Sequence, residues 1–334
     1  MKIIIEEARD PHHQLDLAET LGQMDDHLER VFWTFLEHPH VFEVASRFHY
    51  ADSLGRWRKR DNLPGSEAAT DPDSQKRLGQ AISDYYRSRE GRGRACHIDH
   101  YRRDERLYWF AYPEDYAVGR LVYDHKHQLK LQTQRPAFEV IFVYSTEERS
   151  LDIWVKGQRQ TVSDLQRIFG NVVLGVDLAF EQESGVVYQL DRLLARDFPF
   201  AIKPGDGVEA VHLSRLKLRL MTRGNKRITL EGNTRDEPDA IYNLLDDVLA
   251  NGRLPRTRLQ VASATIKIVF RPADDARRKT LTFAVSHPDS CSLKYEAQHE
   301  IAKNLLKRWG TDVSGRTENG IEQRRRSVQR TLRV

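Results

Sequence analysis

Residues 214–233 read SRLKLRLMTRGNKRITLEGN, and leucines alternate strictly with cationic residues in the first half of this stretch. Successive side chains of an extended chain point to opposite faces, so the segment has one apolar and one cationic face. The leucines are Leu216, Leu218 and Leu220, and the cations are Arg215, Lys217 and Arg219. Arg223 and Lys226 lie at a turn, and residues 226–233 after it form a second predicted strand. The two strands together predict a β-hairpin.

The same order, a hairpin followed by a helix, is predicted three times along the chain. The expected strand pairs are residues 138–144 with 150–157, 212–222 with 226–233, and 265–272 with 279–288. The expected helices are residues 162–175, 238–252 and 294–310, and each is closed by a glycine. An earlier hairpin is expected from residues 95–101 and 106–116.

The N-terminal part is expected to be mainly helical, because apolar residues recur there at helical spacing. Helices are predicted at residues 14–40, 41–54 and 74–90, and a first strand is predicted from the three isoleucines of residues 1–10. Residues 56–73 lack periodicity and gather turn residues, so we expect a loop there.

These patterns predict an α+β fold with a helical N-terminal segment followed by antiparallel β-hairpins, each covered by a helix. Two domains are expected, at residues 1–180 and 181–310, followed by a basic, flexible tail at residues 311–334. A mixed sheet in two domains would explain the same pattern equally well.

Composition limits the class of protein only broadly. The chain has 334 residues and a net charge of +4, which permits an anionic partner without requiring one. Its two cysteines, Cys96 and Cys291, exclude a disulfide framework and favour a reducing compartment. No apolar stretch approaches the ~18 residues of a membrane span. The start is not typical of a signal peptide, so we expect a cytoplasmic protein with no membrane partner.

Cationic residues gather in two segments that we expect to contact nucleic-acid phosphates. Strand residues two apart are separated by about 6.8 Å, close to the roughly 6 to 7 Å between successive phosphates of one strand. The predicted binding residues are Arg215, Lys217, Arg219, Arg223, Lys226 and Arg227 of the hairpin, with Arg56, Trp57, Arg58, Lys59 and Arg60 of the loop. The alternative is a solvated sheet face whose cations protect an edge strand. Glu231 on the same face would offset one of these cations.

A third group consists of His97, Asp99 and His100, which could supply metal ligands or an acid–base pair. In a strand His97 and Asp99 share one face, and His100 points to the other. The chain has no phosphate-binding loop, complete dinucleotide fingerprint or nucleophile elbow. We therefore predict no cofactor and no bound metal, and the sequence is not typical of an enzyme.

Three functions are compatible with these features. The first is a non-enzymatic bacterial nucleic-acid-binding protein, with DNA preferred to RNA as its partner. The second is an interaction subunit or scaffold of a multi-protein bacterial system, such as an antiviral phage-defence complex, in which the cationic row meets an acidic protein. The third is a metal-dependent hydrolase or nuclease that uses His97, Asp99 and His100.

Overall fold

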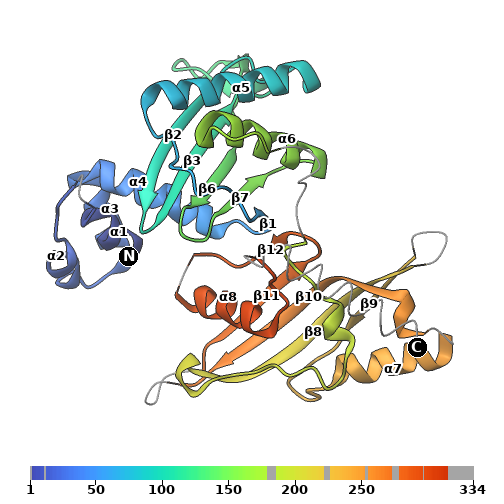
Figure 1. Cartoon of the computed structure of the whole chain (residues 1–334). Helices are drawn as coiled ribbons and strands as arrows, with labels where there is room; N and C mark the ends of the chain where they lie inside the picture. Colours follow the sequence, from blue (N-terminus) through green and yellow to red (C-terminus); the bar gives the residue numbers. More distant parts are fainter. Residues whose placement is uncertain are drawn as a thin grey trace. The chain divides into compact units, whose positions relative to one another are not determined.

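The computed structural model describes residues 2–10, 13–178, 186–221, 226–252, 255–272, 278–295 and 297–314 (Figure 1). The chain divides into two compact units. The first consists of residues 1–55 and 294–296, and the second of residues 56–293 and 297–334. The domain boundary predicted at residue 180 and residues 315–334 of the predicted tail lie outside the described residues, and both stay predictions.

The first unit is helical. Its helices are α1 (Lys2–Ala8), α2 (Ala18–Gly22), α3 (His27–Glu37) and α4 (Pro39–Ser53). Its core consists of Ile4, Ala8, Leu17, Leu21, Val41 and Ala45. The Asp26 carboxylate caps α3 by accepting a hydrogen bond from the Leu28 N–H, and Pro39 stands in the first turn of α4.

The strand predicted from residues 1–10 is wrong, because this segment forms α1. Ile4 and Ala8 lie one helical turn apart, and both are buried in the core of the first unit. Burial of this i, i+4 pair outweighs the β propensity of three consecutive isoleucines.

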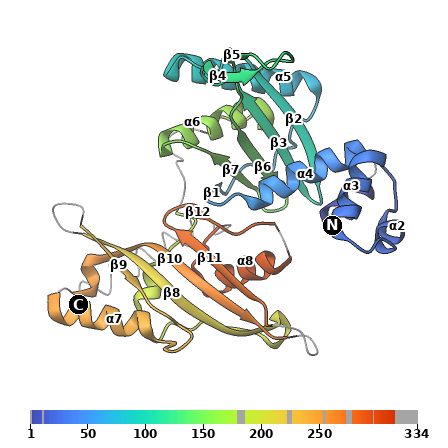
Figure 2. The same cartoon turned by 180° about the vertical axis from the view of Figure 1, so that it is seen from behind.

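The second unit is built on a ten-stranded antiparallel sheet (Figure 2). Its strand order is β2–β3–β6–β7–β1–β12–β11–β10–β8–β9. The strands are β1 (Trp57–Arg60), β2 (Cys96–Arg103), β3 (Arg106–Pro113), β6 (Val140–Ser145), β7 (Ser150–Val155), β8 (Val208–Leu220), β9 (Arg227–Glu231), β10 (Leu259–Phe270), β11 (Thr280–Ser286) and β12 (Ser290–Cys291).

Helices pack on this sheet through two apolar cores. The helices α5 (Pro72–Glu90) and α6 (Arg159–Phe169) share one core with β2, β3, β6 and β7. The helices α7 (Ala240–Gly252) and α8 (Ala297–Trp309) share the other with β8 to β11. A π-helical turn, η1 (Gly170–Leu174), extends α6, and the 3-10 helices η3 (Asp191–Leu194), η4 (Pro204–Asp206) and η5 (Arg256–Arg258) lie in connections.

The predicted α+β class is therefore confirmed. Two predicted helix ends are also confirmed, because Gly175 and Gly310 adopt left-handed conformations with φ of 64° and 67°. Among the described residues, no helix combines the length and apolarity that crossing a membrane requires.

Residues 57–60 differ from the predicted loop. They form β1, which pairs with β7 and β12 inside the sheet. Periodicity could not reveal this strand, because three of its four side chains are charged and their ionic partners lie far away in the sequence. The loop begins only after Arg60.

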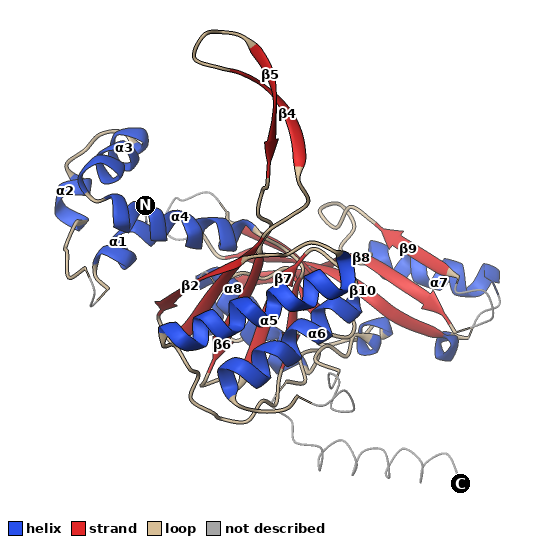
Figure 3. Cartoon of the chain, turned by 90° about the horizontal axis from the view of Figure 1, so that it is seen from above, coloured by secondary structure: helices blue, strands red, loops and turns tan. Residues whose placement is uncertain are grey.

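One hairpin was missed by the sequence analysis. Strands β4 (Val118–Tyr123) and β5 (Leu129–Gln134) form a separate two-stranded sheet, and Figure 3 shows it extending away from the large sheet. A signal was present only in the second strand, where Leu129 and Leu131 alternate with Lys130 and Gln132. In the first strand Val122 separates Leu121 from Tyr123, so the alternation is absent.

Candidate nucleic-acid interface

Strand β8 has the two faces that its sequence predicts. Leu216, Leu218 and Leu220 are at most 8% exposed and belong to the core shared with α7 and α8. Lys217 and Arg219 are exposed on the opposite side, and Arg215 is half-buried. The alternation thus places the cations on the side of the sheet that faces away from that core.

The strands beside β8 extend this outer side. Arg219 lies opposite Arg227 of β9, and Lys217 lies opposite Thr229 of β9 and Ser263 of β10. On β10 and β11, Thr265 lies opposite Ala284 and Lys267 opposite Thr282. We call this outer side of β8 to β11 the cationic face; its lysines and arginines are Arg215, Lys217, Arg219, Arg227 and Lys267.

Arg215 is not free to contact a phosphate as the sequence analysis expected, because it is paired within the protein. Its guanidinium forms an ion pair with the carboxylate of Glu231, which lies opposite it on β9. The hydrogen bond and charge of Glu231 raise the pKa of Arg215, and the hydrogen bond and charge of Arg215 lower the pKa of Glu231. The anticipated offset of one cation is therefore confirmed.

The other cationic side chains of β8 and β9 form fewer contacts within the protein than Arg215 does. Within the described part of the chain, the side chains of Lys217, Arg219 and Arg227 form no hydrogen bond or salt bridge, and all three are exposed. The charge of Lys217 adds to the effect of Arg215 in lowering the pKa of Glu231. Arg219 and Arg227 occupy directly opposed positions, an arrangement of like charges that is unfavourable unless an anion lies between or above them.

Sequence reasoning missed two members of this face, His212 and Lys267. They lie opposite each other on β8 and β10. Burial lowers the pKa of His212, and the charge of Lys267 lowers it further. The signal for Lys267 was its position between Ile266 and Ile268, which are both buried.

The turn of the hairpin is only partly described. Lys226 is exposed, and its carbonyl accepts a hydrogen bond from the Leu220 N–H. The predicted contact residue Arg223 lies outside the described residues.

The second predicted segment, residues 56–60, does not form an exposed cationic loop. Arg56 is exposed, but Trp57, Lys59 and Arg60 are buried. Arg58 donates a hydrogen bond of 2.8 Å to Asp289, and Lys59 donates one of 3.0 Å to Glu148. We correct the expectation of a phosphate-gripping loop, because β1 uses these charges inside the sheet.

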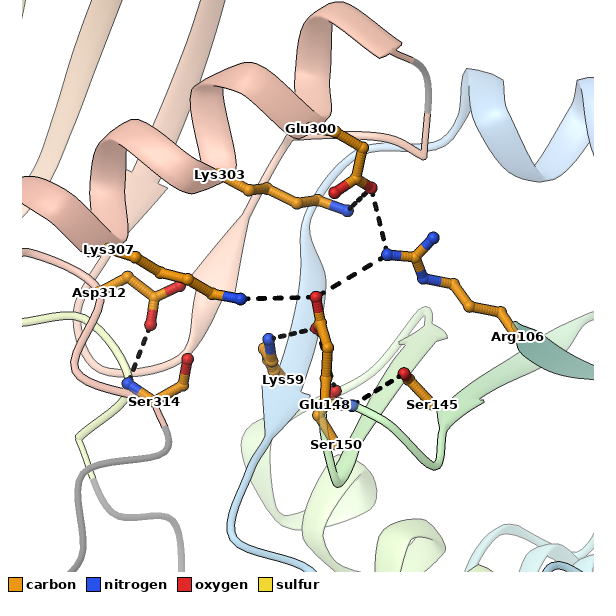
Figure 4. Close-up of polar contacts among 10 residues, drawn as sticks. All are labelled: Lys59, Arg106, Ser145, Glu148, Ser150, Glu300, Lys303, Lys307, Asp312 and Ser314. Carbon is orange, nitrogen blue, oxygen red and sulfur yellow. Dashed lines mark hydrogen bonds and ion pairs between the residues drawn. The ribbon is translucent and has the colours of Figure 1, made fainter. Parts of the chain in front are cut away.

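Glu148 is the centre of the ionic cluster in which Lys59 takes part (Figure 4). Its carboxylate lies 3.5 Å from Lys307 and 3.8 Å from Arg106, and Arg106 also pairs with Glu300. Burial by itself would raise the pKa of Glu148, but Lys59 and Lys307 outweigh it and bring the pKa to about 2. The cluster therefore ties β1, β3 and the β6–β7 turn to α8.

The three candidate metal or catalytic residues lie on β2 as expected. The Nε2 of His97 lies 2.9 Å from Oδ1 of Asp99, and His100 is on the opposite face with its ring against Trp109. Burial lowers the pKa of His100 to about 4. Within the described part of the chain, no three His, Cys, Asp or Glu side chains gather in a way that could hold a metal ion.

His97 also borders a groove of about 480 Å³ between α5 and β2. The groove has Lys76 and Arg94 in its lining and lies beside β2, at the end of the strand order opposite to β9. It therefore does not belong to the cationic face.

No protein-family model matches the chain, and no curated protein matches it.

Proposed function

We propose that this protein binds nucleic acid through the cationic face of β8 to β11. The observation that supports the proposal is the presence of three exposed cations, Lys217, Arg219 and Arg227, whose side chains form no salt bridge among the described residues. Exposed cations that are not neutralised within the protein are the groups that displace counterions from phosphates.

The rest of the cationic face suits contacts with a sugar–phosphate backbone. Thr229, Thr265 and Thr282 place hydroxyl groups between the cations, and hydroxyls donate hydrogen bonds readily to phosphate oxygens. The described residues of this face include no Phe, Tyr or Trp that could stack on a base. We therefore propose electrostatic binding with little sequence specificity, and DNA remains the preferred partner.

The test is fluorescence anisotropy with labelled duplex DNA and duplex RNA of the same sequence across a salt series. With about three phosphates neutralised, the logarithm of the association constant should fall against the logarithm of salt concentration with a slope of about −3. The Lys217→Glu, Arg219→Glu variant should bind more weakly and show a slope shallower by about 2.

A matched control separates this face from general charge. Lys156 and Arg167 are exposed on the β7–α6 side of the unit, and the Lys156→Glu, Arg167→Glu variant changes the net charge equally. The control should bind as the unchanged protein does. Equal weakening by both variants would assign binding to net charge alone, and absence of binding at low salt would refute the proposal.

A second candidate function, an interaction subunit, is favoured by α3. Leu28, Phe32, Phe35 and Leu36 are 50% to 71% exposed and lie on one side of this helix. Thr34 of α3 is buried and Trp33 packs against the core of the unit, whereas these four apolar side chains point away from that core. Exposed apolar surface of this extent is typical of a protein contact site.

A further inference from the structure

Strand β9 forms one end of the ten-stranded sheet, and within the described part of the chain its neighbour in the sheet is β8 alone. Residues of an antiparallel pair alternate between those that bond to the neighbouring strand and those whose N–H and C=O point away from it. The Leu220 N–H donates to the Lys226 carbonyl, so the even-numbered positions of β9 face β8. Arg227, Thr229 and Glu231 therefore direct their backbone groups to the open edge.

The sequence of β9, RITLE, is self-complementary in charge. When two such strands run antiparallel with Thr229 on a two-fold axis, the outward-facing residues of one strand meet those of the other. Each Arg227 then lies opposite a Glu231, and no two like charges lie opposite each other. The opposed pairs, taken one residue beyond each end of β9, are Arg227 with Glu231, Ile228 with Leu230, Thr229 with its own counterpart, and Lys226 with Gly232.

We propose that β9 pairs in this register with β9 of a second copy of the chain, so that the two large sheets become one. The carboxylate of the second copy relieves a like-charge contact, because Arg227 lies opposite Arg219 within its own chain. Glu231 already accepts a hydrogen bond from Arg215 through Oε1, and its two carboxylate oxygens allow it to accept from both arginines. A surface that is complementary to itself is what a two-fold interface requires.

Helix α7 lies where it adds to this contact. It packs against both β8 and β9 (Figure 2), and thus over the space between these two strands. Neighbouring strands are about 4.8 Å apart, so the α7 helices of two copies joined at β9 lie roughly 10 Å apart on the same side of the joint sheet. Helices in contact have their axes about 8 to 10 Å apart. Pairing of the strands therefore also brings the two α7 helices together.

The side of α7 nearer the β9 edge offers an apolar group for this helix contact. Ala240 lies on that side, because a Cβ added to Gly232, the residue after β9, would stand 2.7 Å from the Ala240 Cβ. Leu244 lies one turn further along the same side and is 37% exposed. Asp246, which bonds to two arginines, lies on the opposite side of the helix. Half-buried Val248 and exposed Asn251 continue the side of Leu244, and exposed Asp247 borders it.

Sedimentation equilibrium of the full chain without nucleic acid tests the assembly separately from nucleic-acid binding. The unchanged protein should sediment as a dimer. Arg227→Glu places a carboxylate opposite Glu231 twice in each dimer and should raise the dissociation constant about 10-fold or more. Combining Arg227→Glu with Glu231→Arg exchanges the two charges and should restore the dimer. Lys217→Glu makes the same change of net charge on β8, away from the edge, and should leave the dimer intact.

A second variant tests the position of the axis. Thr229→Lys places a lysine opposite the same lysine of the second copy and should also dissociate the dimer. Thr282→Lys adds the same charge to exposed β11 of the cationic face and should not. A monomeric unchanged protein would overturn the proposal and leave the β9 edge to a different partner. A dimer that survives Arg227→Glu, a charge exchange that fails to restore it, or equal dissociation by Lys217→Glu would overturn the proposal as well.

Discussion

The ammonium group of Lys59 donates a 3.0 Å hydrogen bond to the carboxylate of Glu148, although 89 positions separate the two residues in the sequence. The Lys59 side chain is only 9% exposed and that of Glu148 25% exposed. Burial would lower the pKa of Lys59, but the charges of Asp152 and Glu148 raise it above its ordinary value. Each residue therefore keeps the other ionised inside the second unit.

Replacing Glu148 by glutamine should destabilise the second unit. The substitution removes the carboxylate that pairs with Lys59 and leaves Asp152 as the nearby charge that favours the buried ammonium. Breaking a buried ion pair in this way costs about 3 kcal/mol. Urea unfolding followed by tryptophan fluorescence measures the loss. Glu147→Gln is the matched control, because Glu147 is the exposed neighbour and should cost less than about 0.5 kcal/mol. Equal losses from both variants would contradict the role assigned to the pair.

The same carboxylate predicts a loss of stability in acid. The pKa of Glu148 falls from 4.5 to about 2 in the folded chain, so the unfolded chain takes up the proton first as the pH decreases. The stabilisation is therefore complete above about pH 5 and is lost as the pH falls toward 2, by about 3 kcal/mol in total. Unfolding free energies measured between pH 6 and pH 3 should decrease more steeply for the unchanged protein than for Glu148→Gln. Parallel curves would show that other groups cause the acid sensitivity.

Local periodicity was sufficient to predict the elements that bury one face against one core. The alternation around Leu218 predicted β8, and the register of its hairpin correctly placed Glu231 beside the cationic row. Such patterns are readable because the signal lies within a few residues.

The elements that the sequence analysis missed depend on distant partners. Arg58 of β1 is matched by Asp289, 231 positions away, so no local pattern shows that a charged strand can lie inside the sheet. The segment around Ile4 forms a helix because Ile4 and Ala8 lie on one side of α1 and pack there against residues of other helices. Tertiary contacts decided both cases against local propensity.

Replacing Glu231 by glutamine should strengthen nucleic-acid binding. The variant releases Arg215 from its ion pair and removes the carboxylate from the cationic face. One further phosphate contact should steepen the salt slope by about 0.9 for duplex DNA. Anisotropy at two salt concentrations would detect the change. Glu147→Gln again serves as the control, because it makes the same substitution on an exposed turn away from the cationic face. Unchanged affinity and slope for Glu231→Gln would indicate that Arg215 does not face the ligand.

The last prediction concerns the apolar side of α3. Phe32 is 62% and Leu36 56% exposed, so replacing both by serine should change the stability of the first unit by less than about 0.5 kcal/mol. By contrast, Leu21 is 1% exposed in the core of the same unit, and Leu21→Ser should cost about 3 kcal/mol. Hydrogen exchange of the α1 to α4 amides reports the stability of this unit separately from the second.

The comparison between these two variants decides what covers α3. If Phe32→Ser with Leu36→Ser preserves protection in the purified protein, the apolar side is open and available to a partner, as an interaction subunit requires. If the double variant loses protection to the extent that Leu21→Ser does, Phe32 and Leu36 are already buried in solution. The apolar side of α3 would then no longer support an interaction subunit, and nucleic-acid binding would remain as the function to test.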